Sequence, residues 1–547
     1  MTRRARDLLA GLIFGLSAAA LAVAAADPAA AASVLRRVSQ VDPETLDPQK
    51  SSGGFEQAIE MDLLEGLTSY DADARPVPGV AERWETSADG LTWTFHLRND
   101  AKWSDGTPVT ADDFVAAFRR LVDPATASPS AQMFDAVAGA ARIIAGAEKN
   151  LETLGAKPID PHTVQLKLDH PMPLLPDLLA TGAGLPINRA ALAKYGDQWT
   201  RPGNFVSNGP FVLASVAAQS ELVLKRNPMF HDQAKVALDE VHWLVVEDDQ
   251  TALKRYRAGE LDISRVPAGE LDWAKRTLAN QLHVQPQLAV VYMAINMHAE
   301  PLASNLKLRK ALSMAIDREV LSDKVEPAGE IAAYSFITGG LDGYESQSLA
   351  FKSMSSTDRV AEARKLFEES GAGKAGPLKL SVIYATDRDK KRMLLAIAAM
   401  WKECCNIELT LVNREWQVFL ANLRQHDFQL AYDNISGSYS DAYDVLSGFR
   451  SGAGEINDAA YANPAYDALI DRASATIDAA ERAKLLGRAE QILLNDAAVL
   501  PLNFPVYRAV VATRVRGWED NLLNIHPSRY LAFAPGSSAS SNAAPNP

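Results

Sequence analysis

Strand-like and helix-like segments alternate along almost the whole of this 547-residue chain. Short β-branched or alternating runs predict strands, and longer runs with apolar residues every three to four positions predict helices. The predicted strands are 93–98, 163–168, 222–226, 241–246, 284–296, 378–384 and 407–412. The predicted helices are 111–121, 307–315, 358–370, 390–403, 464–475 and 480–494. This alternation indicates an α/β fold, and the length exceeds what one hydrophobic core supports, so two or three domains are expected.

The N-terminus has the features of an export signal. Three arginines within the first six residues precede an alanine-rich apolar stretch, 8–26, with small residues after it. Cleavage after Ala26 and cleavage after Ala32 both fit the pattern, and no cysteine follows that could be acylated. We expect residues 1–32 to be a cleaved signal peptide and the mature protein to be periplasmic.

Composition and motifs argue against several classes of function. A net charge of −13 makes the chain a poor nucleic-acid binder. The nine histidines show no HxxxH or HxH pairing, so no metal site is expected. The glycines at 371, 373 and 376 match a dinucleotide fingerprint, but they follow a predicted helix and precede a strand, which is the reverse of the required order. No nucleophile is paired with a base, so we expect no cofactor, no catalytic residue and no enzyme, and a periplasmic hydrolase is the disfavoured alternative.

The two cysteines are neighbours in sequence, at positions 404 and 405. A bridge between adjacent residues would be strained. We therefore expect a fold that does not depend on disulfides.

Several segments carry a recognisable pattern. The most specific runs from Ala101 to Phe114 (AKWSDGTPVTADDF) and continues through 122–129 (VDPATASP). Further matching segments are 45–48, 63–67, 76–84, 93–98, 208–211, 256–262, 309–312 with 317–318, and 413–416. Together they resemble the family 5 extracellular solute-binding proteins, and 122–129 is similar to the oligopeptide-binding branch. Much of the 101–114 segment also has a purely structural explanation, because Ser104 to Pro108 is a turn by composition and Thr110 is a natural N-cap.

The resemblance implies a bilobal periplasmic-binding-protein fold with an additional domain and hinge-linked lobes that enclose a ligand on closure. It also implies that the chain passes between the lobes more than once. The expected divisions are lobe I (33–70, 188–292 and 506–533), the additional domain (71–187), lobe II (293–505) and a disordered tail (534–547).

The function implied by the resemblance is that of the substrate-binding component of an ABC importer. Such a protein captures oligopeptides between its lobes and delivers them to an inner-membrane permease, and similar proteins are usually monomers. In the oligopeptide branch an Asp pairs the peptide amine, while Lys, His and Arg lie near the carboxylate.

The residues at those positions differ here. Ser438 falls where the branch has the amine-binding Asp, although Tyr439 and Asp441 are retained. Since breaking a buried ion pair costs about 3–5 kcal/mol, a peptide amine would need another partner, such as Asp433 or Asp441.

The basic positions change as well. Tyr432 stands at the position of the branch's Arg, Asp389 near the position of its His and Glu326 near the position of its Lys. Ser130 replaces a pocket tyrosine, and Trp416 keeps a cleft tryptophan. The candidate ligand-binding residues are therefore Trp416, Tyr432, Ser438, Tyr439, Asp441, Asp389, Glu326 and Ser130.

Three interpretations stay open. The protein binds small peptides in spite of these changes, or its ligand is a modified, capped or cationic compound that needs no such partners. The third is a chaperone or sensory receptor on the same scaffold. For Trp416 and Tyr439, simple packing is the alternative to ligand contact.

Overall fold

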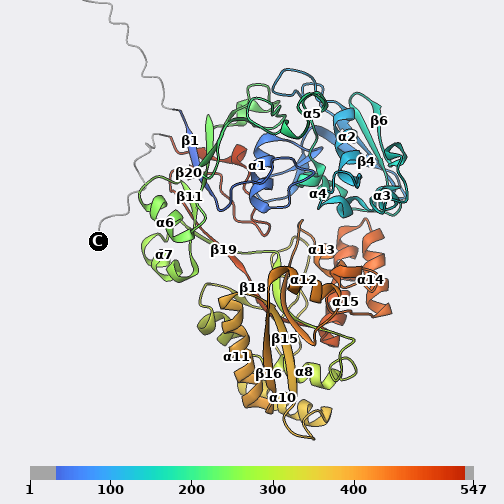
Figure 1. Cartoon of the computed structure of the whole chain (residues 1–547), viewed down its shortest axis with the longest axis vertical. Helices are drawn as coiled ribbons and strands as arrows, with labels where there is room; N and C mark the ends of the chain where they lie inside the picture. Colours follow the sequence, from blue (N-terminus) through green and yellow to red (C-terminus); the bar gives the residue numbers. More distant parts are fainter. Residues whose placement is uncertain (1–31, 536–547) are drawn as a thin grey trace, which may run out of the picture.

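The computed structural model describes residues 32–535, which form two bodies joined by a narrow connection (Figure 1). The predicted signal peptide lies outside the described residues except for Ala32, and so does the predicted tail from residue 536. No helix of the described part is long and apolar enough to cross a membrane.

The first body, lobe I, is built on a seven-stranded mixed sheet. Its strand order is β12-β19-β11-β1-β10-β9-β8, and β1 pairs with β10 in parallel. The strands are β1 (Val34–Ser39), β8 (Phe211–Ala217), β9 (Glu221–Arg226), β10 (Glu240–Val245), β11 (Ile263–Arg265), β12 (Leu282–Pro286) and β19 (Val506–Val511). The helices around it are α1 (Gly54–Leu63), α5 (Arg189–Tyr195), α6 (Asp249–Arg257) and α7 (Leu271–Thr277). Strands distant in sequence therefore lie side by side in one sheet.

A four-stranded antiparallel sheet, order β4-β5-β7-β6, forms the additional domain beside lobe I. Its elements are β4 (Ala81–Thr86), β5 (Thr92–Leu97), α2 (Ala111–Val122), α3 (Ala140–Ile144), β6 (Ala156–Asp160), β7 (Thr163–Lys167) and α4 (Leu175–Ala180). The first turn of α2 is held by Asp113, whose Oδ2 accepts from the Thr110 backbone N–H at 2.9 Å and from Trp103 Nε1 at 3.2 Å. Lobe I and this domain share one continuous apolar core, so we expect them to move together.

Lobe II carries a six-stranded sheet, order β14-β18-β13-β17-β15-β16. Its strands are β13 (Ala289–Ile295), β14 (Ile331–Ala332), β15 (Lys379–Ala385), β16 (Glu408–Arg414), β17 (Leu430–Ser436) and β18 (Val499–Phe504). Its main helices are α8 (Leu306–Met314), α10 (Ser356–Ser370), α11 (Arg388–Cys405), α12 (Trp416–Arg424), α13 (Ala442–Ser447), α14 (Pro464–Ala475) and α15 (Ala479–Asp496). Its core is separate from that of lobe I, and it includes the fully buried Trp401, whose Nε1 donates to the Leu312 carbonyl at 3.0 Å.

Two neighbouring connections join the lobes. One leads from β12 to β13 and the other from β18 to β19. The backbone N–H of Gln287 in the first donates to the carbonyl of Pro505 in the second at 3.0 Å. Because the two cores are separate and the strand connections are short and paired, this is where rotation of one lobe against the other would occur.

The predicted elements are present in the structure with one correction. The single strand predicted over 284–296 is two strands, β12 and β13, because the chain leaves the lobe I sheet and enters the lobe II sheet between them. Helix α14 begins and ends at the predicted residues, with the Asn463 side chain accepting from the Ala465 backbone N–H at 2.9 Å. The sulfur atoms of Cys404 and Cys405, at the end of α11, lie in contact with each other; a link between adjacent residues closes no loop, so a fold that does not depend on disulfides stays a prediction.

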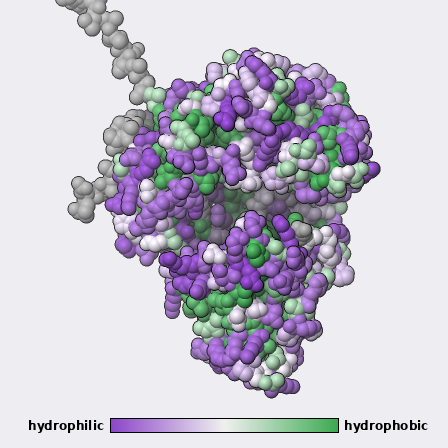
Figure 2. All heavy atoms as spheres, viewed as in Figure 1, coloured by the Kyte–Doolittle hydropathy of each residue, from purple (hydrophilic) through white to green (hydrophobic). Residues whose placement is uncertain are grey.

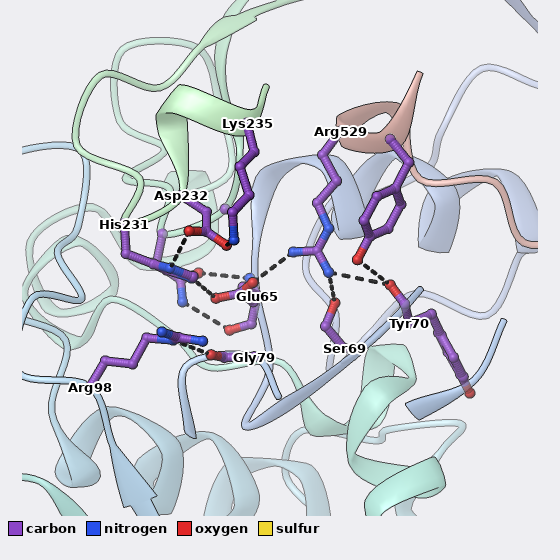
Figure 3. Close-up of polar contacts among 12 residues, drawn as sticks. Glu65, Ser69, Tyr70, Gly79, Arg98, His231, Asp232, Lys235 and Arg529 are labelled. Atoms are coloured by element: carbon purple, nitrogen blue, oxygen red, sulfur yellow. Dashed lines mark hydrogen bonds and ion pairs between the residues drawn. The ribbon is translucent and has the colours of Figure 1, made fainter. Parts of the chain in front are cut away.

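A buried ionic network ties distant segments of lobe I together (Figure 3). Glu65, which follows α1, lies 2.7 Å from His231 Nε2 and accepts from Arg529 Nη1 at 2.6 Å. Arg529 also donates to Ser69 Oγ at 2.6 Å. Burial alone would raise the pKa of Glu65, but the hydrogen bond from His231 and the charge of Arg529 outweigh it and hold that pKa below its usual range. The network fixes the C-terminal segment to the start of the chain.

Candidate functional site

A cavity with a volume of about 560 Å³ lies between the two lobes. Figure 2 shows the surface hollowed between the upper and lower bodies at this level. Lobe I and the additional domain supply most of its wall, and the end of β17 supplies the lobe II side. A cavity of this size between two hinged bodies can hold a ligand of a few residues.

The lobe I wall combines aromatic and cationic groups. Arg37 stacks on Trp243 with its guanidinium carbon 4.3 Å from the ring centre, and it donates to Ser528 Oγ at 2.8 Å. Burial lowers the pKa of Arg37, against the opposing charge of Asp62. Arg265 also lines the cavity, lies over the Tyr507 ring and donates to the side chain of Gln40. These groups give this wall affinity for aromatic and anionic parts of a ligand.

On the lobe II side, β17 presents a free backbone edge. The strand pairs with β13 over all seven of its residues, 430–436, but with β15 only from Leu430 to Tyr432. From Asp433 to Ser436 its second edge therefore has no partner strand among the described residues, and Ser436, Gly437 and Ser438 line the cavity. An extended peptide can add to such an edge through main-chain hydrogen bonds.

Three of the predicted site residues lie at the additional-domain end of the cleft. Ser130 and Ser438 both line the large cavity. Ser438 and the buried Tyr439 also line a smaller cavity of about 260 Å³ between the additional domain and lobe II. The structure thus brings Ser130, Ser438 and Tyr439 to one place from two different domains.

Three others form a second group inside lobe II. Tyr432 is buried in β17, and the carboxylates of Glu326 and Asp389 lie near enough to raise its pKa further after burial itself. The pKa of Glu326 is raised to about 6 by burial, with Glu330 and Asp389 adding to the effect. Asp389 is exposed and pairs with Arg392 at 3.0 Å. This group does not line the large cavity in the described conformation.

The remaining predicted residues lie apart. Trp416 is the first residue of α12, a helix in the part of lobe II nearest lobe I (Figure 1); its side chain is 49% exposed and stacks on Phe419. Asp441 caps α13 and pairs with Arg482 at 2.6 Å, so its charge is already matched.

Asp433, the other acid that the sequence offers as a partner for a peptide amine, has a different environment. Burial and the neighbouring Asp458 raise its pKa, and Tyr292 donates to Asp458 at 3.1 Å. Two negative charges side by side are disfavoured at this place within lobe II, so Asp433 is poorly suited to offer a full charge to a peptide amine.

Sequence reasoning missed most of the lobe I wall. Arg37, Trp243 and Arg265 lie on β1, β10 and β11, which the order of the seven-stranded sheet brings together, and His526 lies in the C-terminal segment, where its carbonyl accepts from Arg37 Nη1. His526 stacks on Trp518, and burial lowers its pKa to about 3, so it lines the cleft as a neutral ring. No local motif marks any of these residues.

We find no candidate metal-binding site in the part of the chain that the structure describes. No group of three or more His, Cys, Asp or Glu side chains there is arranged to hold a metal ion. What the site offers is hydrogen bonding, stacking and ion pairing, which are the means of reversible binding.

Comparison with known proteins agrees with this arrangement. Residues 75–457 match the bacterial extracellular solute-binding proteins, family 5 Middle. The chain belongs to this family. Among family 5 relatives, the periplasmic oligopeptide-binding protein OppA of Escherichia coli (strain K12) is 36% identical over 93% of this chain and 94% of that protein. The predicted family is confirmed.

Two further similarities bear on fold and ligand. The unliganded open form of MppA, a periplasmic murein tripeptide-binding protein, has a TM-score of 0.83 and 33% identity over 92% of this chain and 98% of that one. The bilobal fold is therefore confirmed. A probable deoxycholate-binding periplasmic protein of Escherichia coli (strain K12), YgiS, is 32% identical over 88% of this chain and 90% of that protein. Proteins at this level of similarity thus carry names for ligands of different chemistry, so the cleft itself must indicate the ligand.

Proposed function

We propose that this protein is the periplasmic substrate-binding component of an ABC importer and that it captures small peptides between its lobes. The observation that carries the proposal is the interlobe cavity of about 560 Å³, walled by both lobes beside the free edge of β17. A peptide lying along Asp433–Ser436 would gain main-chain hydrogen bonds that do not depend on its sequence.

Closure follows from the two connections at Gln287 and Pro505. Rotation there would bring β17 and α12 toward the lobe I wall and enclose the ligand. The closed protein would then dock on an inner-membrane permease that contacts both lobes. The protein would act as a monomer, exported by its N-terminal signal, and no covalent step is involved.

A peptide's two charged ends need partners in such a cleft. Arg265 is a cation on the lobe I wall with 31% of its side chain exposed; its Nε lies 3.9 Å from Asp249 Oδ2, so a ligand carboxylate there would share Arg265 with Asp249. At the other end, Ser438 carries no charge, and Asp441 is already paired with Arg482.

A second candidate ligand follows from these substitutions. Glu326, Asp389 and Tyr432 stand where the resemblance implies basic residues, and Ser438 stands where it implies an acid. Such a site favours a capped, modified or cationic compound over an ordinary zwitterionic peptide, since a buried charge without a partner is costly.

A thermal-shift screen of the mature protein tests both candidate ligand classes, small peptides and capped, modified or cationic compounds. The probes are trialanine, its N-acetyl and C-amide forms, spermidine and deoxycholate. A ligand that binds only the native state raises the melting temperature by mass action. A rise with trialanine supports peptide capture, and a rise only with capped or cationic probes supports the second candidate. A rise with deoxycholate alone would refute both.

A further inference from the structure

The smaller cavity, about 260 Å³, lies beyond the end of the main cleft. One wall comes from the additional domain, through Met133, Asp135 and His170, and the other from lobe II, through Ser438 and Asp444. Met133 and Ser438 line the main cavity too, so the two spaces adjoin. A volume below the range of about 300–1,000 Å³ for whole ligand sites fits a subsite that takes one group of a ligand.

Negative charge in this cavity exceeds positive charge. Asp444, on α13, accepts a hydrogen bond from the backbone N–H of Ser438, and no ion pair to it occurs within residues 32–535. Asp135 lines the same cavity from the additional domain, with His170 nearby. Arg482 is the single arginine or lysine among the described lining residues, and it pairs with Asp441 at 2.6 Å. Two carboxylates therefore face the cavity without a permanent cation.

The shape of the passage suits a positively charged group. Ser438 lines both cavities, so a short, uncharged side chain stands where they adjoin. Tyr439 and Tyr443 line the same cavity and supply aromatic surface, which a partly desolvated cation can contact.

We propose that this cavity is a cation subsite, in which Asp444 and Asp135 receive an ammonium or guanidinium group at one end of a ligand whose remainder lies in the main cleft. The inference rests on the proposed binding function and specifies its substrate class. The group is either the α-amine of a peptide or the side chain of a basic first residue. Closure of the lobes would bring the two carboxylates toward that group from opposite walls.

Calorimetric titration of the full mature protein tests the subsite at pH 7.5. The four probes are Ala-Ala-Ala, acetyl-Ala-Ala-Ala, Lys-Ala-Ala and acetyl-Lys-Ala-Ala. We expect acetyl-Ala-Ala-Ala, which has neither cation, to bind at least about 10-fold more weakly than Lys-Ala-Ala, which has both, because removing one partner of a charge pair is costly. Strong binding of acetyl-Lys-Ala-Ala identifies a side-chain cation, and weak binding identifies the α-amine.

Asp444→Asn is the main variant, since the amide oxygen can still accept from Ser438. It should weaken the cationic probes about 10- to 100-fold and change acetyl-Ala-Ala-Ala less than about 2-fold. Asp135→Asn is an independent second variant with the same expected direction. Asp467→Asn is the matched control: Asp467 also lies in the first turn of a lobe II helix and accepts a backbone N–H, from Ser451 at 3.0 Å, but lines neither cavity. Equal affinity of wild type and both test variants for every cationic probe would overturn the subsite.

A probe without peptide bonds separates the two proposals. We expect 1,5-diaminopentane at millimolar concentration to raise the melting temperature of wild type more than that of Asp444→Asn. If it does while no peptide binds, the peptide function is wrong and the cation subsite stands. If neither the diamine nor a cationic peptide distinguishes Asp444→Asn from wild type, the subsite is wrong even where peptides bind.

Discussion

Two carboxylates, the buried Glu65 in lobe I and the half-buried Asp444 in lobe II, illustrate different uses of charge inside the protein. Glu65 is enclosed by His231 and Arg529, and its pKa is held below the usual range (Figure 3). Asp444 has backbone hydrogen bonds and faces a cavity, and burial raises its pKa to about 6. Burial favours the protonated form of both side chains, so the presence or absence of a cationic partner sets the different roles of the two carboxylates. A matched carboxylate holds the fold together, whereas an unmatched one beside a cavity is available to a ligand.

The largest expected effect is at Glu65. Glu65→Gln leaves Arg529 buried without its carboxylate, so we expect a loss of about 3–5 kcal/mol in the free energy of unfolding. Urea denaturation at pH 7.5 measures it. Glu152→Gln is the control, because Glu152 pairs with Arg119 at 2.5 Å but is 70% exposed, and such pairs contribute about 0–1 kcal/mol. Similar small losses for the two variants would show that the network in lobe I is not structural.

Glu60 represents a third case, a buried acid with neither a cation nor a cavity. It is fully buried on α1, its Oε2 accepts from Ser51 Oγ at 3.0 Å, and its Oε1 has no hydrogen-bond partner within residues 32–535. Burial raises its pKa to about 8, with Asp47 and Glu56 adding to the effect. The folded protein therefore keeps a proton on Glu60 at neutral pH.

Glu60→Gln tests that protonation. Between the ordinary Glu pKa and about 8, the folded state binds a proton that the unfolded state has released, so wild-type stability falls as pH rises. From pH 6 to pH 8 we expect wild type to lose about 2 kcal/mol relative to Glu60→Gln, at about 1.4 kcal/mol per pH unit. Denaturation curves at both values measure this difference. Parallel pH dependence of the two proteins would mean that Glu60 is ionised in the fold.

Much of this architecture could be predicted from the sequence, because periodicity and capping are local. Helix α14 follows from Asn463 and Pro464, and the resemblance around 101–114 indicates the two lobes. The cleft could not be predicted in the same way. Its lobe I wall depends on which strands are neighbours in the seven-stranded sheet and on the packing of the C-terminal segment against Arg37, and no local sequence pattern indicates either.

The different roles of the acids near Ser438 could not be predicted either, because they too depend on a residue distant in sequence. In the sequence Asp441 and Asp444 look alike, since both favour the start of a short helix. Their difference comes from Arg482, which lies 41 residues further along the chain and pairs with Asp441. Only the packing of α15 beside α13 leaves Asp444 as the unmatched acid.

Asp444→Asn should act on stability in the opposite direction to Glu65→Gln. Its raised pKa means that the charged form is disfavoured in the fold, so at pH 7.5 we expect the amide to stabilise the ligand-free protein by about 1 kcal/mol. The gain should shrink as pH falls through about 6 toward 4, where the folded wild type takes up a proton. Thermal melts at pH 7.5 and 4.5 measure it. The other titratable or charged groups around Asp444 are Tyr70, Asp135, His170, Asp177, Tyr439, Asp441, Tyr443 and Arg482. A loss at pH 7.5 comparable to that of Glu65→Gln would remove the distinction between the two carboxylates.

The smallest effect on stability is expected at Trp416, whose aromatic ring is 49% exposed. Trp416→Ala removes its stacking on Phe419, so the loss in unfolding free energy should stay below about 1 kcal/mol. If closure places this ring against a ligand, affinity for trialanine should nevertheless fall several-fold, which calorimetry measures. Val418→Ala is the control, since Val418 is 47% exposed on the same helix and should change neither quantity. Unchanged affinity in Trp416→Ala would assign the tryptophan to the surface of lobe II and restrict the ligand to β17 and the lobe I wall.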